Sequence, residues 1–149
     1  MEKQTFKISI NSSPEKIWDI LWSDATYPLW TAPFAEGSKA ETDWKKGSKV
    51  LFTDGTDNGM IATIEENIPN KFMSIKHLGT LKNGVEDLNN PKNETWVGAM
   101  ENYTLKNENE RTELLIDMDV TDEFKEYMQS TWPKALDKVK ELAEKSSYS

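Results

Sequence analysis

The sequence predicts an α+β fold in which sequential strands form a sheet that one long C-terminal helix covers. Between residues 37 and 120, apolar and polar residues alternate in several short runs, which is the pattern of half-buried strands. Residues 121–144 instead repeat apolar side chains at spacings of three, four and seven, the pattern of an amphipathic helix. A helix of this length needs a concave apolar partner, and only the strands can supply it.

The N-terminal part of the chain predicts one strand followed by two short helices. Apolar side chains alternate with polar ones over residues 6–10, as in a half-buried strand. Ser13 fits a helix N-cap and Pro14 fits the first helical position, so a helix is expected to start there. Its apolar face consists of Ile17, Trp18, Leu21 and Trp22. Residues 27–31 predict a second short helix or turn, which Pro33 ends.

The central part of the chain predicts a meander of hairpins. Residues 50–53 and 60–68 have strand character and flank the turn at residues 54–59. Residues 72–78 predict the next strand, and residues 112–120 alternate so regularly that one face of that strand is expected to be dry and the other largely wet. Sequential hairpins of this kind produce an antiparallel sheet.

One irregular segment interrupts the strands. Residues 80–94 are polar and contain Asn-Gly and Asn-Asn-Pro, which favour turns. The segment is too long for a plain turn, so we interpret it as a loop and a candidate lid.

The C-terminal helix is expected to begin with Thr121 or Asp122 as its N-cap. Pro133 removes one helical donor and clashes one turn back, so we expect a kink near residues 129–132. One apolar stripe is expected to face the sheet, made by Phe124, Met128, Ala135, Val139 and Leu142.

Composition limits the functions that the chain can have. Its 149 residues fit a single domain, 1–149, with one substantial core or a core and a cavity. Acidic residues outnumber basic ones by 26 to 18, and no basic cluster exceeds Trp44-Lys-Lys, so nucleic acid is not an expected partner. With no cysteine and one histidine, we expect no disulfide, metal or cofactor. The polar start and the lack of a long apolar run predict a cytoplasmic protein without membrane insertion.

A calcium-loop pattern occurs at residues 54–65. Asp54, Thr56, Asn58 and Glu65 occupy ligand-type positions, and Gly59 stands where such a loop needs a glycine. The flanking sequences are strands, however, whereas a calcium loop of this type lies between helices. We therefore interpret the segment as a tight hairpin that binds no metal.

The order of elements and several motifs together resemble the SRPBCC or START-like superfamily, which has the helix-grip fold of the birch-pollen-allergen type. Within it, the whole chain is most similar to the subfamily named for activators of the ninety-kilodalton heat-shock chaperone's ATPase. The resemblance rests on Ser13-Pro-Glu-Lys-Ile-Trp18, Trp30-Thr-Ala-Pro-Phe34, Asp43-Trp-Lys-Lys-Gly47, Lys76-His-Leu-Gly79, Glu101-Asn-Tyr-Thr-Leu105 and Trp132-Pro-Lys-Ala-Leu136. It implies a curved antiparallel sheet of about seven strands wrapped around the C-terminal helix, with two short helices after the first strand.

The resemblance also implies an apolar cavity between sheet and helix that binds lipids or other small hydrophobic molecules. Given such a cavity, strand alternation and the aromatic residues select the side chains expected to line it. These candidates are Trp30, Phe34, Phe52, Ile64, Met73, Ile75, His77, Trp96, Glu101, Tyr103, Leu114, Ile116, Met128 and Trp132. Plain core packing explains many of them equally well.

Two polar residues share these inward faces. His77 lies in register with Met73 and Ile75, and Glu101 lies in register with Tyr103. A buried carboxylate needs a partner, a proton or access to water. His77 and Glu101 are therefore expected to form a structural pair or a ligand anchor, and an acid/base pair is a further alternative.

Three functions follow from these observations. The first is a non-catalytic domain that binds a small hydrophobic or amphipathic molecule. The second is a cyclase- or hydrolase-like enzyme that uses His77 and Glu101 as acid and base, because some members of the superfamily are enzymes. The third is a chaperone-associated stress-response protein, as the subfamily name suggests, although the chain does not contain the separate N-terminal chaperone-contacting domain of the eukaryotic activators.

Overall fold

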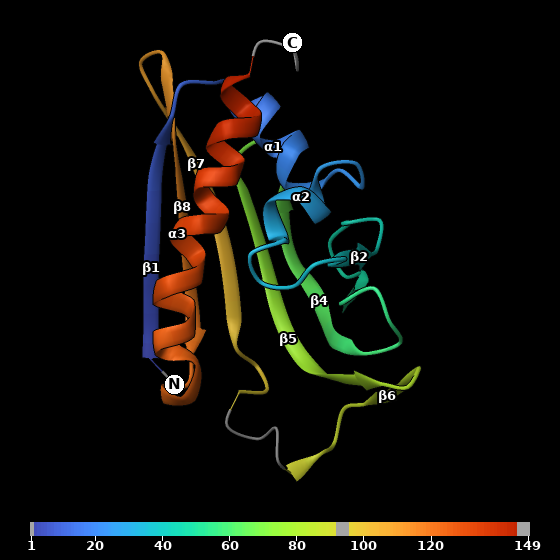
Figure 1. Cartoon of the computed structure of the whole chain (residues 1–149). Coiled ribbons are helices and arrows are strands. Elements are labelled where there is room, and N and C mark those ends of the chain that lie inside the picture. The colour runs from blue at the N-terminus through green and yellow to red at the C-terminus, as the bar shows by residue number, and fades with distance from the viewer. Residues whose placement is uncertain (1, 92–95, 146–149) are drawn as a thin grey trace.

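A computed structural model describes residues 2–91 and 96–145 of the chain. Its centre is one antiparallel sheet, with the strand order β1-β8-β7-β5-β4-β3-β2 and with β6 paired to β5. The helix α3 lies along the concave face of this sheet, and α1 and α2 lie beside it (Figure 1). The elements are β1 (Glu2–Ile10), α1 (Pro14–Trp22), α2 (Tyr27–Thr31), β2 (Lys39–Glu41), β3 (Lys49–Thr53), β4 (Gly59–Ile68), β5 (Phe72–Lys82), β6 (Val85–Asp87), β7 (Met100–Glu108), β8 (Arg111–Val120) and α3 (Asp122–Glu144).

This architecture confirms the predicted α+β helix-grip fold. The sheet has eight strands in the described residues, one more than the prediction of about seven, because β2 and β6 are only three residues each and give little sequence signal. The pairing of β4 with β5 shifts register at two places, between Ile61 and Ala62 and between Ile64 and Glu66. Such irregularities bend a sheet and increase its twist, which helps it to wrap around α3.

Local chemistry explains where α1 begins and ends. The hydroxyl of Ser13 accepts a hydrogen bond from the backbone N–H of Lys16 at 3.2 Å, and Pro14 takes the first helical position, as predicted. At the other end, the Thr26 hydroxyl donates to the carbonyl oxygen of Ile20 at 2.6 Å, so a helix-terminal carbonyl is satisfied from outside the helix. The same contact positions the start of α2.

The solid part of the core lies where α1 and the C-terminal half of α3 pack against the sheet. The side chains there are at most 1% exposed, and they include Ile10, Ile17, Leu21, Val50, Ile64, Met73, Ile75, Leu114, Ile116, Ala135 and Val139. The opposite half of the concave face is covered by α2 and the N-terminal half of α3.

The predicted apolar stripe of α3 is wrong at its N-terminal end. Phe124 is 42% exposed and Met128 is only half-buried, whereas Trp132 and Val139 are buried. Thr121 is the N-cap, but its hydroxyl makes no capping hydrogen bond. The first turns of α3 therefore do not rest on a solid core, and the helix continues through Pro133 to cover the sheet further along.

The predicted loop at residues 80–94 is also partly wrong. β5 extends to Lys82, and Val85–Asp87 folds back on it as β6, so the first half of the segment is a hairpin. Gly79 permits this hairpin, because a Cβ at that position would stand 2.3 Å from the carbonyl oxygen of Asp87. Residues 92–94, which belong to the same prediction, lie outside the described residues.

The turn at residues 54–59 is the predicted hairpin between β3 and β4, with Thr53 paired to Gly59. The Asp54 carboxylate accepts hydrogen bonds from the backbone N–H and the hydroxyl of Thr56 within the turn. Glu65 lies in β4 and is exposed.

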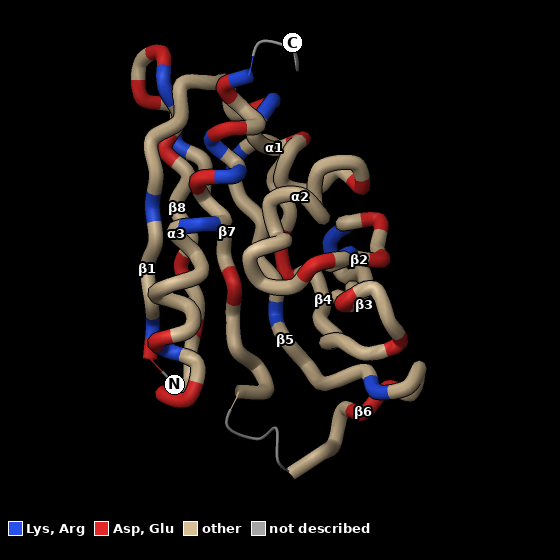
Figure 2. Tube along the Cα trace, in the orientation of Figure 1, with Lys and Arg blue, Asp and Glu red and all other residues tan. Residues whose placement is uncertain are grey.

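Acidic and basic residues are both scattered along the trace (Figure 2). Several of them form exposed ion pairs, such as Lys49 with Glu86 at 2.6 Å and Lys125 with Glu2 at 3.0 Å. In the part of the chain that the structure describes, no helix is both long and apolar enough to cross a membrane.

Candidate functional site

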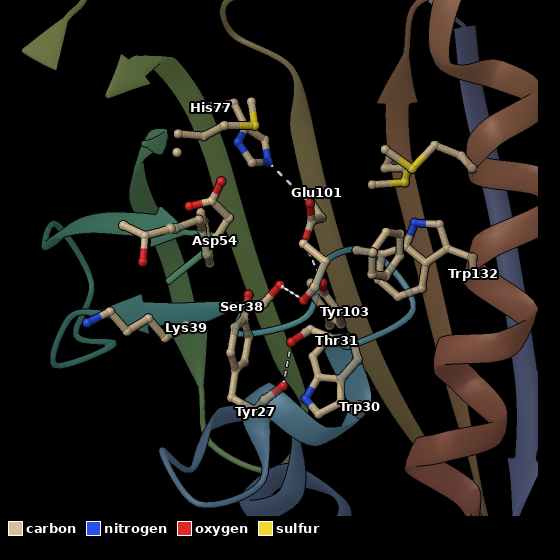
Figure 3. A pocket seen from close by; sticks show the side chains of 18 residues that line it. Tyr27, Trp30, Thr31, Ser38, Lys39, Asp54, His77, Glu101, Tyr103 and Trp132 are labelled. Atoms are coloured by element: carbon tan, nitrogen blue, oxygen red, sulfur yellow. Dashed lines mark hydrogen bonds and ion pairs between the residues drawn. The ribbon is translucent and has the colours of Figure 1, made fainter. Parts of the chain in front are cut away.

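The candidate site is built around a polar pair on two neighbouring strands. His77 lies on β5 and Glu101 on β7, and the pairing of these strands places Glu101 opposite Ile75 and His77 next to Ala99. The two side chains meet diagonally, with His77 Nε2 3.2 Å from Glu101 Oε1 (Figure 3). They are only 13% and 16% exposed. Strand alignment therefore forms a buried polar contact within an apolar face.

Tyr103 extends this contact into a three-residue cluster. It lies two residues after Glu101 on β7, so both side chains project from the same face of the strand. Its hydroxyl donates a hydrogen bond to the Oε2 atom of Glu101. Each carboxylate oxygen of Glu101 thus has one donor, which is the usual way for a protein to keep a buried carboxylate ionised.

The surroundings shift the pKa values of the cluster. Burial alone would raise the pKa of Glu101, but the hydrogen bonds from His77 and Tyr103 and the charge of His77 outweigh it and hold that pKa below its ordinary value. Burial, reinforced by the nearby Glu101 carboxylate, raises the pKa of Tyr103 and of Tyr27 well above the usual tyrosine value. At neutral pH Glu101 is therefore a carboxylate, and Tyr103 and Tyr27 are protonated phenols.

One nitrogen of His77 has no partner. Its Nδ1 atom is buried and makes no hydrogen bond to any described residue. A hydrogen on Nε2 satisfies the contact with Glu101. Because Nδ1 is buried, it offers a ligand no accessible hydrogen-bonding position.

The cluster lies in the wall of a partly open cavity of about 260 Å³, which residues of α2, the sheet and α3 line. The lining is mostly apolar and aromatic, and Trp132 projects into it from α3 (Figure 3). The lining residues are Tyr27, Trp30, Thr31, Phe34, Ala35, Ser38, Lys39, Phe52, Thr53, Asp54, Gly59, Met60, His77, Glu101, Tyr103, Met118, Met128 and Trp132.

A second cavity of about 340 Å³ adjoins the first and is lined in part by the first turns of α3. Its lining adds residues from β5, from the segment that leads into β7, from the end of β8 and from the start of α3. These are Thr80, Trp96, Ala99, Met100, Asp119, Val120, Thr121 and Phe124. The two cavities share Met60, His77, Glu101, Met118 and Met128, so the polar pair stands between them.

Of the residues that the sequence predicted to line a cavity, the structure places nine at a cavity and five in the solid core. Eight line the first cavity, namely Trp30, Phe34, Phe52, His77, Glu101, Tyr103, Met128 and Trp132, and Trp96 lines the second. The other five line neither, because α1 and the C-terminal half of α3 fill the concave face there. These are Ile64, Met73, Ile75, Leu114 and Ile116, each at most 1% exposed.

Sequence reasoning missed Tyr27 and gave Met60 and Met118 no role in the cavity, although their strand positions face inward. Tyr27 reaches the cavity because α2 folds over the sheet, where its ring lies 5.4 Å from that of Trp30 and 6.3 Å from that of Phe52. Its spacing from Trp30 on a short helix was the only available signal.

A curved antiparallel sheet that grips a C-terminal helix, with a cavity between them, defines the helix-grip class of α+β proteins. The family model described as Activator of Hsp90 ATPase homolog 1-like protein matches residues 11–144, and the chain belongs to this family within the SRPBCC superfamily. The match covers every element described above except β1.

Solved structures support the same fold. The Aha1 dimer from Colwellia psychrerythraea is 24% identical, with a TM-score of 0.73 and coverage of 97% of both chains. A protein from Mesorhizobium loti is 16% identical, with a TM-score of 0.72 and coverage of 95% of this chain and 96% of that one. A protein from Cytophaga hutchinsonii is 18% identical, with a TM-score of 0.71 and coverage of 100% and 98%. At these identities the likeness concerns the fold alone. No curated protein matches the chain significantly in sequence.

Proposed function

We propose that this protein binds a small hydrophobic or amphipathic molecule between its sheet and its C-terminal helix. The observation that carries the proposal is the aromatic-lined cavity that contains the Glu101 cluster in its wall. Ligand sites in proteins are typically concave and apolar, with a few convergent polar groups and volumes of roughly 300 to 1,000 Å³. The first cavity, of about 260 Å³, is slightly smaller than this range, and the adjoining one, of about 340 Å³, lies at its lower end.

The side chains around the cavity favour a flat or flexible apolar ligand. Trp30, Phe34, Phe52 and Trp132 offer ring faces and edges, and Trp30 and Trp132 lie 6.1 Å apart between ring centres. Methionines line the boundary between the two cavities. Because methionine is unbranched and polarisable, it adapts to ligands of different shape. This composition supports a site that accepts a class of molecules rather than one rigid shape.

The His77–Glu101–Tyr103 cluster supports an orienting role. It places a largely buried carboxylate in a mostly apolar wall, and a ligand with one polar end can place that end there. We infer that the apolar remainder of the ligand lies against Trp30 and Trp132.

The enzymatic alternative has weaker support. A general base works best when its pKa lies near the working pH, whereas the two donors of Glu101 hold its pKa below the ordinary value of 4.5. The contact with a chaperone and the cytoplasmic location stay predictions from the family resemblance and the composition.

A cavity-filling variant tests the proposal. Ala35 lines the first cavity, so Ala35→Phe should fill part of it and weaken binding of 2-naphthalenemethanol by at least about tenfold, since it removes contact area that stabilises the complex. Ala25 is exposed and lines neither cavity, so Ala25→Phe is the matched control and should bind as the unmodified protein does.

Isothermal titration calorimetry measures both variants and the unmodified chain. Native mass spectrometry of freshly purified protein, before any ligand is added, shows whether a small molecule co-purifies. The proposal fails if the unmodified protein binds no apolar probe, or if Ala35→Phe folds and binds with unchanged affinity.

A further inference from the structure

We propose that the cavity selects ligands whose polar end donates hydrogen bonds, such as an alcohol or an amine, and discriminates against carboxylates and phosphates of the same skeleton. The inference rests on the proposed binding function and concerns the chemistry of its ligand. It follows from the hydrogen-bonding capacity that the cluster in the cavity wall has left over.

The accessible hydrogen-bond donors of the cluster are already engaged with Glu101. The Tyr103 hydroxyl hydrogen is engaged by Glu101 Oε2, and His77 Nε2 is engaged by Glu101 Oε1 at 3.2 Å. A carboxylate offers about four lone-pair positions, of which these contacts take two, and the Tyr103 oxygen keeps its own lone pairs. The positions that a ligand can still use are acceptors, so the matching ligand group is a donor.

The unpaired side-chain donors that are buried near the cavities do not reverse this preference. Trp132 Nε1, Thr53 Oγ1 and Thr121 Oγ1 have no partner among the described residues, but each atom is buried and gives a ligand no accessible surface. The hydroxyls of Thr31 and Ser38 already donate to the backbone carbonyl oxygens of Tyr27 and Ala35.

The Tyr27 hydroxyl is a further polar group of the first cavity, and it discriminates little between donor and acceptor ligands. A protonated phenol can donate or accept, and its raised pKa keeps it protonated at neutral pH. It can therefore bind an alcohol oxygen or an alcohol hydrogen equally well, and the choice of ligand falls to Glu101.

The charged residues that line the cavities also disfavour an anionic ligand. Asp54 and Glu101 line the first cavity, and Glu101 and Asp119 line the second. Lys39 also lines the first cavity, but it is 53% exposed and lies 3.4 Å from Glu41, so solvent and that partner screen its charge. A second anion placed beside Glu101 would meet like charge in a poorly solvated space, which is unfavourable.

Four ligands with one skeleton test the inference on the unmodified protein. They are 2-methylnaphthalene, 2-naphthalenemethanol, 2-naphthylmethylamine and 2-naphthoate, each titrated by calorimetry at the same pH and ionic strength. We expect the alcohol and the amine to bind at least about tenfold tighter than the carboxylate, which is the fold-change of one hydrogen bond to a charged group. The alcohol should also bind more tightly than the hydrocarbon.

Glu101→Gln identifies the source of the selectivity. It removes the charge and keeps the size, so the amine should lose affinity and the carboxylate should gain it, while the hydrocarbon stays unchanged. Glu108→Gln removes a carboxylate from an exposed position at the end of the same strand and should leave all four affinities as they were. If Glu101→Gln does not fold, the ranking on the unmodified protein still decides the question.

The possible results separate the two proposals. If the hydrocarbon and the other probes bind with equal affinity, or the carboxylate binds tightest, the donor preference is wrong and the binding function stands. If none of the four probes binds, the binding function fails and the donor preference fails with it. If Glu101→Gln still prefers the alcohol and the amine to the carboxylate, Glu101 is not the source of the selectivity.

Discussion

The indole nitrogen of Trp30 donates a hydrogen bond to the carbonyl oxygen of Leu21, 3.1 Å away, and so joins α2 to the end of α1. Leu21 is one of the last residues of α1, where carbonyl oxygens have no donor within the helix. Trp132, on the opposite wall of the cavity, is equally buried, but its indole nitrogen has no partner in the described structure.

This difference predicts unequal effects of two otherwise matched substitutions. Trp30→Phe leaves a buried carbonyl without its donor, which costs about 1–3 kcal/mol in addition to the lost indole area. Trp132→Phe loses similar area but also removes a buried, unpaired N–H. We expect Trp30→Phe to lower the free energy of unfolding by about 1–2 kcal/mol more than Trp132→Phe. Urea denaturation measures both, and equal losses would show that the Trp30 hydrogen bond contributes nothing.

The lowered pKa of Glu101 predicts a specific loss of stability in acid. Its folded-state pKa lies below the ordinary value of 4.5, so its stabilising contribution is complete above that pH and disappears as the pH falls through the folded-state pKa. The difference in unfolding free energy between the unmodified protein and Glu101→Gln should therefore shrink as the pH falls from about 5.5 through the folded-state pKa of Glu101, which lies below 4.5. Other carboxyl groups are the same in both proteins and cancel in the difference.

The comparison requires urea titrations of both proteins at each pH. Glu108→Gln is again the control, because Glu108 is exposed. The difference in unfolding free energy between this variant and the unmodified protein should stay constant across the pH range. A difference for Glu101→Gln that is equally constant would mean that Glu101 is not held ionised by His77 and Tyr103.

Calcium should leave the protein unchanged. The Asp54 carboxylate is engaged with Thr56 inside its turn, and Glu65 is exposed along β4 rather than folded back toward the turn. A bound ion would stabilise the native state by mass action and raise the melting temperature. We expect superimposable melting curves in millimolar calcium and in EDTA. A calcium-dependent rise that Asp54→Asn abolishes would contradict the interpretation of this segment as a plain hairpin.

The sequence predicted elements and inward faces better than the boundary of the cavity. Alternation placed His77 and Glu101 on inward faces because that signal is local to each strand. Their contact depends on the register of β5 with β7, which long-range pairing sets. Ile75 and Ile116 have the same pattern as cavity residues, but α1 and α3 cover them, and no local pattern reports that packing.

The tryptophans provide a direct test of the central claim, which is that an apolar ligand binds between sheet and helix. Of the six in the chain, Trp30 and Trp132 line the first cavity and Trp96 lines the second, whereas Trp18, Trp22 and Trp44 line neither. The decisive measurement is the shift of each indole N–H signal in nitrogen-15 NMR spectra during titration with 2-naphthalenemethanol. The account predicts saturable shifts that are largest for Trp30 and Trp132, with much smaller shifts for the three that line neither cavity. Shifts that are absent, or that are largest for Trp18 or Trp44, would contradict it.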